Sequence, residues 1–277
     1  MSTLQDLSTD DILRKLRVSS VHLVNLDSDD QPKGIASGCL LDCERSRLLI
    51  TVAHAQQDGA PLAIELGWDE GQRQVVYHKV SRLTTMEFSF KLPQGVETDT
   101  LEATDIEINT NIDFAFAKIP ITVSPLCQQL NESGKILASD SCTIWTMESI
   151  TAPNPDQQYG FAGRTKPQLE KHAVVNILST VFRVRYPLKF VGEQNGFYVF
   201  LLPDEKPSPG LFKGCSGAPI IDMDGHVVAL HSASSRDRPL IYGVPLNQEK
   251  LAALCIESIG LENLPGWKEL KEAQENS

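Results

Sequence analysis

Three short segments of the sequence carry side chains that together could perform nucleophilic catalysis. His54 ends an apolar run, Asp113 precedes an alternating apolar run, and Ser216 lies between Gly214 and Gly217. A serine hydroxyl is a poor nucleophile at neutral pH, so it needs an imidazole within hydrogen-bonding reach to accept its proton. A carboxylate beside the imidazole would fix its tautomer and stabilise its charged form. These residue types therefore predict acyl transfer through Ser216, provided that the fold brings them together.

The elements expected to position these side chains are β-strands. From residue 18 to about residue 121, brief runs rich in Val, Ile, Thr and Phe alternate with polar turn signals, and a second series of short runs occupies residues 135–244. This spacing predicts an all-β protein with two antiparallel β-units in tandem. Residues 151–165 are rich in Pro, Asn, Gln and Gly and lack periodicity, which favours a long surface loop.

Helices are expected only near the two ends. Ser8, with Asp11 three positions later, forms a capping-box pattern ahead of an amphipathic stretch, which predicts a short helix over residues 8–17. Near the other end, Asn247 can cap a helix with Leu251 and Leu254 on its apolar face.

Composition and charge exclude several classes of protein. The 277 residues are 41% hydrophobic, and 25 Lys+Arg against 36 Asp+Glu give a formal net charge of −11. The basic residues are scattered, which argues against nucleic acid or an anionic membrane as partner. The start of the chain lacks the basic and apolar regions of a secretory signal, and no apolar run is long enough to span a membrane. The six cysteines show no metal-site spacing, so we expect reduced thiols, a cytoplasmic location, and neither metal nor cofactor.

The order of the three candidate residues along the chain is that of one of the convergent catalytic triads. Singly, each has an ordinary structural explanation. With its neighbours, however, the sequence resembles the chymotrypsin-like (trypsin-fold) serine proteases, and the stripped-down bacterial and viral members in particular. The matching segments are Thr51-Val52-Ala53-His54 (Thr-Ala-Ala-His in the family), Asp113-Phe114-Ala115 (Asp-Ile-Ala), Gly214-Cys215-Ser216-Gly217-Ala218-Pro219 (Gly-Asp-Ser-Gly-Gly-Pro) and the closing strand at Tyr242-Gly243-Val244-Pro245.

This resemblance, which covers about residues 18–257, implies a specific architecture. It predicts two tandem six-stranded antiparallel β-barrels, with a short N-terminal helix and a C-terminal helix. The implied divisions are an N-terminal helix or arm at residues 1–17, a first barrel at 18–125 that carries His54 and Asp113, and a second barrel with the C-terminal helix at 126–277 that carries Ser216.

The resemblance also implies an activity. Ser216, His54 and Asp113 would form the triad of a serine endopeptidase, and the backbone N–H groups of Gly214 and Ser216 would bind the developing oxyanion. The partners would be a protein or peptide substrate and, where activity must be restrained, a regulatory protein.

Substrate preference follows from the positions that match the family's specificity pocket. Gly210 stands at the pocket floor, so the acidic group that would select a basic residue at the cleaved bond (P1) is missing. Ser232, Ala233 and Ser234 match the edge that pairs with an extended substrate. His231, just before them, could donate a hydrogen bond to a P1 Glu or Gln. The alternative is that His231 only packs inside the barrel.

Departures from the secreted members leave two alternatives open. Cys215 stands where zymogen-activated members have Asp, and Ala55 where they have a disulfide cysteine, so neither proteolytic activation nor that disulfide is expected. Cys215 is itself an alternative nucleophile, although register favours Ser216. The chain could also be a catalytically silent member that keeps the fold as a peptide-binding or scaffolding module. An α/β-hydrolase is disfavoured because its triad follows the order serine, acid, histidine.

Overall fold

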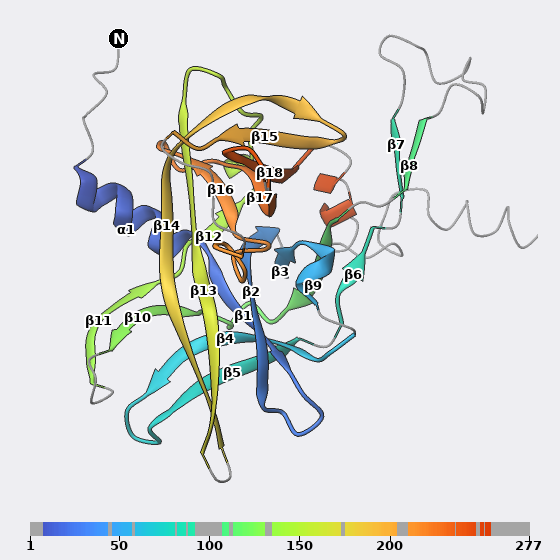
Figure 1. Cartoon of the computed structure of the whole chain (residues 1–277). Coiled ribbons are helices and arrows are strands. Elements are labelled where there is room, and N and C mark those ends of the chain that lie inside the picture. The colour runs from blue at the N-terminus through green and yellow to red at the C-terminus, as the bar shows by residue number, and fades with distance from the viewer. Residues whose placement is uncertain are drawn as a thin grey trace, which may run out of the picture.

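The fold is known from a computed structural model and is all-β, as the sequence predicts (Figure 1). The structure describes residues 8–43, 46–56, 59–80, 82–86, 88–91, 107–110, 113–130, 135–172, 175–203, 210–235, 237–247, 250–251 and 253–255. Within these ranges it contains an N-terminal helix, one large open sheet, one closed barrel and two small two-stranded sheets. None of the described helices is long and apolar enough to cross a membrane.

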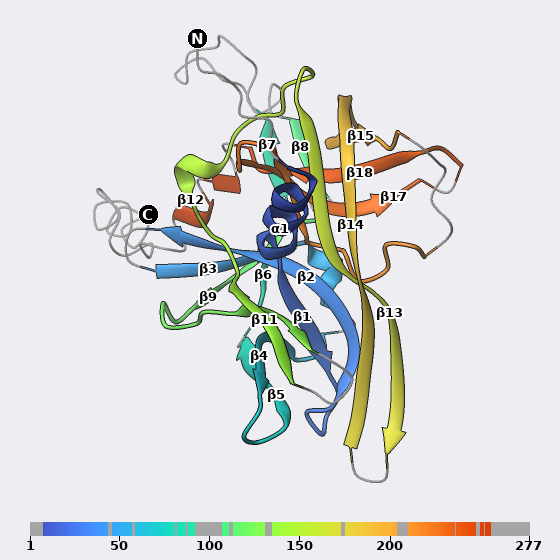
Figure 2. The same cartoon turned by 90° about the vertical axis from the view of Figure 1, so that its left-hand side faces the viewer.

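Helix α1 (Thr9–Ser19) confirms the predicted N-terminal helix. The Ser8 side chain caps it by accepting a hydrogen bond from the Asp11 amide at 3.2 Å. Leu16 is fully buried and packs against Gly160, where a Cβ would lie 2.9 Å from its methyl groups. The helix therefore lies against the barrel strands (Figure 2). Residues 1–7 of the predicted arm lie outside the described residues.

The first β-unit is an eight-stranded sheet in the order β5-β4-β1-β2-β3-β9-β6, with β12 beside β2. Its strands are β1 (Val21–Leu26), β2 (Pro32–Cys43), β3 (Ser46–Thr51), β4 (Leu62–Asp69), β5 (Gln74–Val80), β6 (Thr84–Thr85), β9 (Ala115–Ile119) and β12 (Ile144–Thr146). Among the described residues its edges do not join, because β6 is two residues long and pairs with β9 alone. A closed first barrel of six strands is therefore not confirmed.

Two hairpins form small sheets of their own beside this unit. They are β7 (Phe88–Lys91) with β8 (Glu107–Thr110), and β10 (Leu126–Leu130) with β11 (Ile136–Ser141). Strands β10 to β12 come after residue 125, yet they are not strands of the closed barrel, which begins with β13. The division of the chain at residues 125 and 126 stays a prediction.

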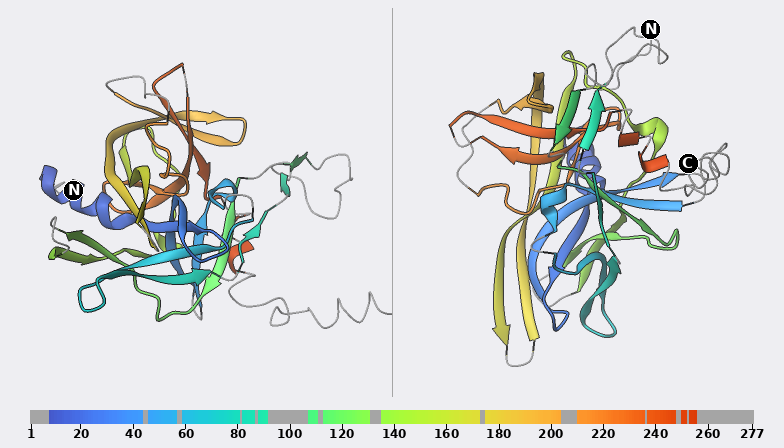
Figure 3. Two further views of the ribbon diagram at one scale, coloured as in Figure 1. Left: turned by 60° about the horizontal axis from the view of Figure 1, so that its bottom comes forward. Right: turned by 90° about the vertical axis from the view of Figure 1, so that its right-hand side faces the viewer.

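The second β-unit is a closed six-stranded barrel in the order β13-β14-β15-β18-β17-β16, as predicted. Its strands are β13 (Gln158–His172), β14 (Val175–Gln194), β15 (Phe197–Leu201), β16 (Pro219–Asp222), β17 (Val227–Ser234) and β18 (Leu240–Pro245). The long β13–β14 hairpin extends beyond the barrel and lies along β1 and β2 (Figure 3). The sequence predicts a loop over residues 151–165, but β13 already begins at Gln158. The predicted loop is therefore wrong for residues 158–165.

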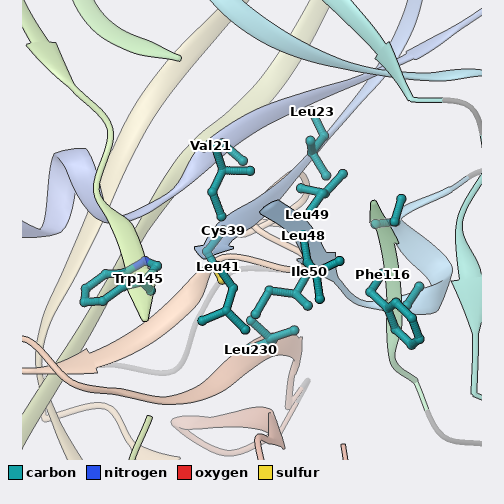
Figure 4. Packing of buried hydrophobic residues seen from close by; sticks show 14 of the residues in the cluster. Val21, Leu23, Cys39, Leu41, Leu48, Leu49, Ile50, Phe116, Trp145 and Leu230 are labelled. Carbon is teal, nitrogen blue, oxygen red and sulfur yellow. The ribbon is translucent and has the colours of Figure 1, made fainter. Parts of the chain in front are cut away.

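The two β-units share a hydrophobic core. One buried cluster joins residues of the open sheet to barrel residues such as Leu230, which packs near Leu41 and Ile50 (Figure 4). A bidentate ion pair also crosses between the units, with Arg164 of β13 donating to Glu65 of β4 at 2.5 and 2.6 Å. Glu65 is buried and Arg164 is partly buried, and the two parallel hydrogen bonds favour one relative position of the two surfaces. The described residues therefore form two β-units joined by this shared cluster, while a separate cluster that includes Tyr159 and Phe200 fills the barrel.

The C-terminal helix is described only at its start. Asn247 Oδ1 accepts a hydrogen bond from the Lys250 amide at 3.3 Å, which is the predicted cap, and residues 250–251 and 253–255 are helical. The remainder of the expected helix lies outside the described residues, so the helix as a whole is not confirmed.

Candidate active site

His54 is held at the end of strand β3 by a short 3-10 turn (Ala53–Ala55). Val52 and Ala55 on either side of it are buried, and the Asn25 side chain donates to the Ala55 carbonyl at 3.0 Å. With its neighbours anchored inward, the His54 side chain projects outward and is 49% exposed.

Asp113 reaches the same place from the adjacent strand. It precedes β9, which pairs with β3 so that Ala115 lies opposite Thr51. The Asp113 carboxylate lies 2.8 and 2.9 Å from His54 Nδ1 and also accepts a hydrogen bond from the His54 amide at 3.2 Å. The imidazole is therefore oriented by its ring nitrogen and its backbone together.

Ser216 comes from the barrel, in a turn that we call the serine loop (residues 210–218), just ahead of β16. Its Oγ lies 2.9 Å from His54 Nε2, the ring nitrogen that faces away from Asp113. The structure thus brings together the three predicted side chains, from two strands of one β-unit and a loop of the other. The hydroxyl, the imidazole and the carboxylate are hydrogen-bonded in the spatial order that proton transfer from the serine requires.

Ser232 adds a fourth member to this chain of hydrogen bonds. Its hydroxyl donates to Asp113 Oδ2 at 2.6 Å. Burial raises the pKa of Asp113, but hydrogen bonds from the His54 ring and the Ser232 hydroxyl, with the His54 charge and amide, outweigh it and leave the pKa below its usual value. The carboxylate is therefore ionised at neutral pH. The sequence placed Ser232 at the substrate edge and gave no signal for this contact, which depends on long-range strand register.

Two backbone N–H groups next to the Ser216 side chain, those of Gly214 and Ser216, are unused within the described residues. The amides of Lys213, Cys215, Gly217 and Ala218 donate to carbonyls of Gly210, Phe212, His231 and Cys215, respectively. Among the described residues, the amides of Gly214 and Ser216 have no acceptor. Two free donors beside a serine hydroxyl have the arrangement that binds an oxyanion in acyl transfer.

The loop's shape depends on glycine at two of its positions. Gly214 has φ 107° and Gly217 has φ 88°, a region where other residues are strained. A Cβ on Gly217 would also collide with the Ser37 carbonyl and the Thr51 hydroxyl of the open sheet. The Gly-flanked serine in the sequence therefore reflects a turn pressed closely against the other β-unit.

His231 is buried inside the barrel, 2% exposed. Its ring stacks on Phe161 at 4.6 Å between centroids and meets Phe212 edge-on at 5.9 Å. Burial, and to a lesser extent the charge on His54, lower the pKa of His231 to about 3, although a weak hydrogen-bonding contact with the Cys215 backbone raises it. The ring is therefore neutral at physiological pH. Neither ring nitrogen has a partner of regular hydrogen-bond geometry within the described part of the chain.

The other predicted substrate-binding residues lie on the loop and strand that border Ser216. Gly210, with φ 73°, begins the serine loop. Ala233 and Ser234 pair with β18 on one side, while β16 stops pairing with β17 at Leu230. In the described chain, the opposite edge of Ala233 and Ser234 therefore has no strand beside it, as pairing with an extended peptide requires.

Cys215 is a poor candidate for the nucleophile. Its side chain is fully buried, and burial raises the pKa of the thiol to about 12, against the opposing charges of Arg183 and Arg185. The thiol form, which is the weak nucleophile, therefore dominates at neutral pH. A Cβ at Gly163 would lie 3.0 Å from the sulfur, so Cys215 fills space beneath the loop.

Within the described part of the chain, one group of side chains has metal-ligand atom types. Ligand atoms of Asp222, Asp224 and His226 lie within 4.8 Å of one another. However, Asp222 Oδ1 accepts hydrogen bonds from the amides of Gly225 and His226, and its Oδ2 lies 3.0 Å from His226 Nδ1. The group is accounted for by the tight turn between β16 and β17.

Comparisons with known proteins add distant structural likeness. No family model matches the chain, and no curated protein matches its sequence. Among solved structures, the chain is similar to the serine endoprotease from Yersinia pestis, with 12% sequence identity and a TM-score of 0.44. The likeness covers 91% of this chain and 66% of that chain, so the present chain spans slightly less than two thirds of its length.

Proposed function

We propose that the protein is a serine endopeptidase with Ser216 as nucleophile, His54 as general base and Asp113 as the residue that orients the imidazole. The observation that carries this proposal is the 2.9 Å distance between His54 Nε2 and Ser216 Oγ, with Asp113 on the opposite ring nitrogen. A half-exposed histidine with a purely structural role does not require a carboxylate on one ring nitrogen and a serine hydroxyl on the other.

In the proposed reaction, Ser216 Oγ attacks the carbonyl carbon of the substrate while its proton moves to His54 Nε2. The amides of Gly214 and Ser216 bind the carbonyl oxygen as it becomes negative. His54 then transfers the proton to the leaving amine, which leaves an acyl group on Ser216. Water, with His54 again as base, releases the acid product and restores the hydroxyl.

A fluorophosphonate probe tests this assignment without knowledge of the substrate. We expect the folded protein to be labelled once, with the modified peptide containing Ser216, as mass spectrometry of a digest would show. Acid-denatured protein is the control, because labelling requires the intact hydrogen-bond chain. Folded protein that takes no label would instead favour the alternative, a catalytically silent peptide-binding or scaffolding module.

We further propose that the substrate is a protein or peptide with Glu or Gln at P1, read by His231. A neutral imidazole supplies one N–H donor and no charge, and both ring nitrogens of His231 lack a regular partner among the described residues. A peptide-library profile is expected to peak at Glu and Gln, and His231→Phe, which retains an aromatic ring against Phe161, to flatten it. A wild-type profile that peaks at aromatic or basic P1 would contradict this preference.

A further inference from the structure

Ser37, on strand β2 of the open sheet, contacts the serine loop at two points. It is fully buried. Its hydroxyl donates to the Gly214 carbonyl at 2.9 Å, and its amide donates to the Ser216 carbonyl at 2.8 Å. Its own carbonyl accepts a hydrogen bond from the Thr51 hydroxyl at 2.7 Å, which holds Ser37 in place. One residue thus binds the carbonyls on both sides of Cys215.

The free amides of Gly214 and Ser216 are restrained unequally. The amide of Ser216 shares a peptide plane with the Cys215 carbonyl, which accepts from the Ala218 amide at 2.9 Å. The amide of Gly214 shares a plane with the Lys213 carbonyl, and in the described chain neither group has a hydrogen-bond partner. The Lys213–Gly214 peptide is therefore the plane that lacks a hydrogen bond of its own.

The next peptide plane, Gly214–Cys215, is held at both of its polar groups: the Gly214 carbonyl accepts from the Ser37 hydroxyl, and the Cys215 amide donates to the Phe212 carbonyl at 2.9 Å. Only the φ and ψ angles of Gly214 separate this held plane from the free donor. Glycine crosses φ space more readily than any other residue. Loss of the Ser37 hydroxyl would leave the Cys215 amide as the single hydrogen-bonded group of that plane, so rotation about Gly214 would turn its amide away from Ser216 more readily.

We propose that Ser37 is a positioning residue that keeps the Gly214 amide aimed at the oxyanion. The inference rests on the proposed function, because it concerns the same reaction. Ser37 does not touch the reacting atoms. It acts through the serine loop, and it couples the orientation of a donor in the barrel unit to a strand of the open sheet.

The test compares Ser37→Ala with a matched control, Ser20→Ala. Ser20 is also fully buried, and its hydroxyl also donates to a barrel carbonyl, that of Ala162 at 2.9 Å, away from the serine loop. Both variants should lower the melting temperature by similar amounts. With p-nitrophenyl acetate, Ser37→Ala is expected to lower kcat about tenfold or more with little change in KM, because a transition-state contact is lost.

A second rate gives the same comparison without turnover. The fluorophosphonate labelling rate should fall with Ser37→Ala and stay close to wild type with Ser20→Ala, since the phosphonyl oxygen uses the same donors. Thr51→Val removes the hydroxyl that donates to the Ser37 carbonyl, at nearly constant volume, and should lower kcat and the labelling rate by a smaller factor. If Ser37→Ala does not fold, the Thr51→Val variant provides the test.

The outcomes separate this inference from the proposed function. Ser37→Ala and Ser20→Ala with equal kcat and equal labelling rates, in a protein whose wild type is active, would overturn the role of Ser37 alone. A folded wild type that neither hydrolyses the ester nor takes the label would contradict the proposed function and the inference together.

Discussion

Ser216→Ala is expected to lower peptide hydrolysis by about a million-fold, since loss of the nucleophile removes the covalent route entirely. The remaining rate would come from binding and oxyanion contacts alone. The melting temperature should change little, because the substitution removes one exposed hydrogen bond, that to His54. The measurement is the initial rate of cleavage of the best library peptide, with thermal unfolding recorded in parallel.

The matched control for this substitution is Cys215→Ala, at the neighbouring residue that the sequence leaves open as a nucleophile. Its thiol is fully buried with a raised pKa, so the variant should lose stability through a small cavity but keep the fluorophosphonate label. Activity that survives Ser216→Ala and disappears in Cys215→Ala would transfer the nucleophile to Cys215.

Asp113→Asn should lower kcat by about ten-thousand-fold at neutral pH. The asparagine amide can donate to His54 Nδ1, which would leave the proton on Nε2, where the ring could no longer accept the proton of Ser216. The Ser232 hydroxyl would also lose the carboxylate to which it donates at 2.6 Å. Steady-state kinetics from pH 6 to pH 10 would measure the loss.

The control for Asp113→Asn is Ser232→Ala, which removes one hydrogen bond to the carboxylate and leaves the imidazole tautomer unchanged. We expect a loss of about tenfold, in line with a single hydrogen bond to a charged group. An Asp113→Asn enzyme with near wild-type kcat would remove Asp113 from the proposed triad.

The proximity of His54, Asp113 and Ser216 was predicted from their order along the chain and from the resemblance of their segments to the chymotrypsin-like proteases, because no single segment indicates it. The contacts of Ser37 and Ser232 with this group were not. Each depends on which residues of distant strands lie opposite each other, and a one-residue change in register would turn either side chain to the other face. Ordinary serines in β-strands carry no local sign of such a role.

The main error in the predicted fold concerns the start of the barrel. Gly160 and Gly163 suggested a loop, yet both are in β13 because another group occupies the space of a side chain, Leu16 at Gly160 and Cys215 at Gly163. Composition cannot distinguish glycine needed for a turn from glycine needed for close packing. The sequence also could not show that the first sheet is open, because runs of strand-forming residues do not indicate whether the two edge strands pair with each other.

His54 and Ser216 belong to separate hydrogen-bonded β-structures, and only side chains and a few backbone contacts join the two. A small pivot of the barrel on the open sheet would part the hydroxyl from the imidazole while every strand stayed paired. A displacement of about 1 Å can cost about a hundredfold in rate. The rate of the proposed hydrolysis should therefore report the relative position of the two β-units. On warming, this rate should fall before circular dichroism records any loss of strand structure.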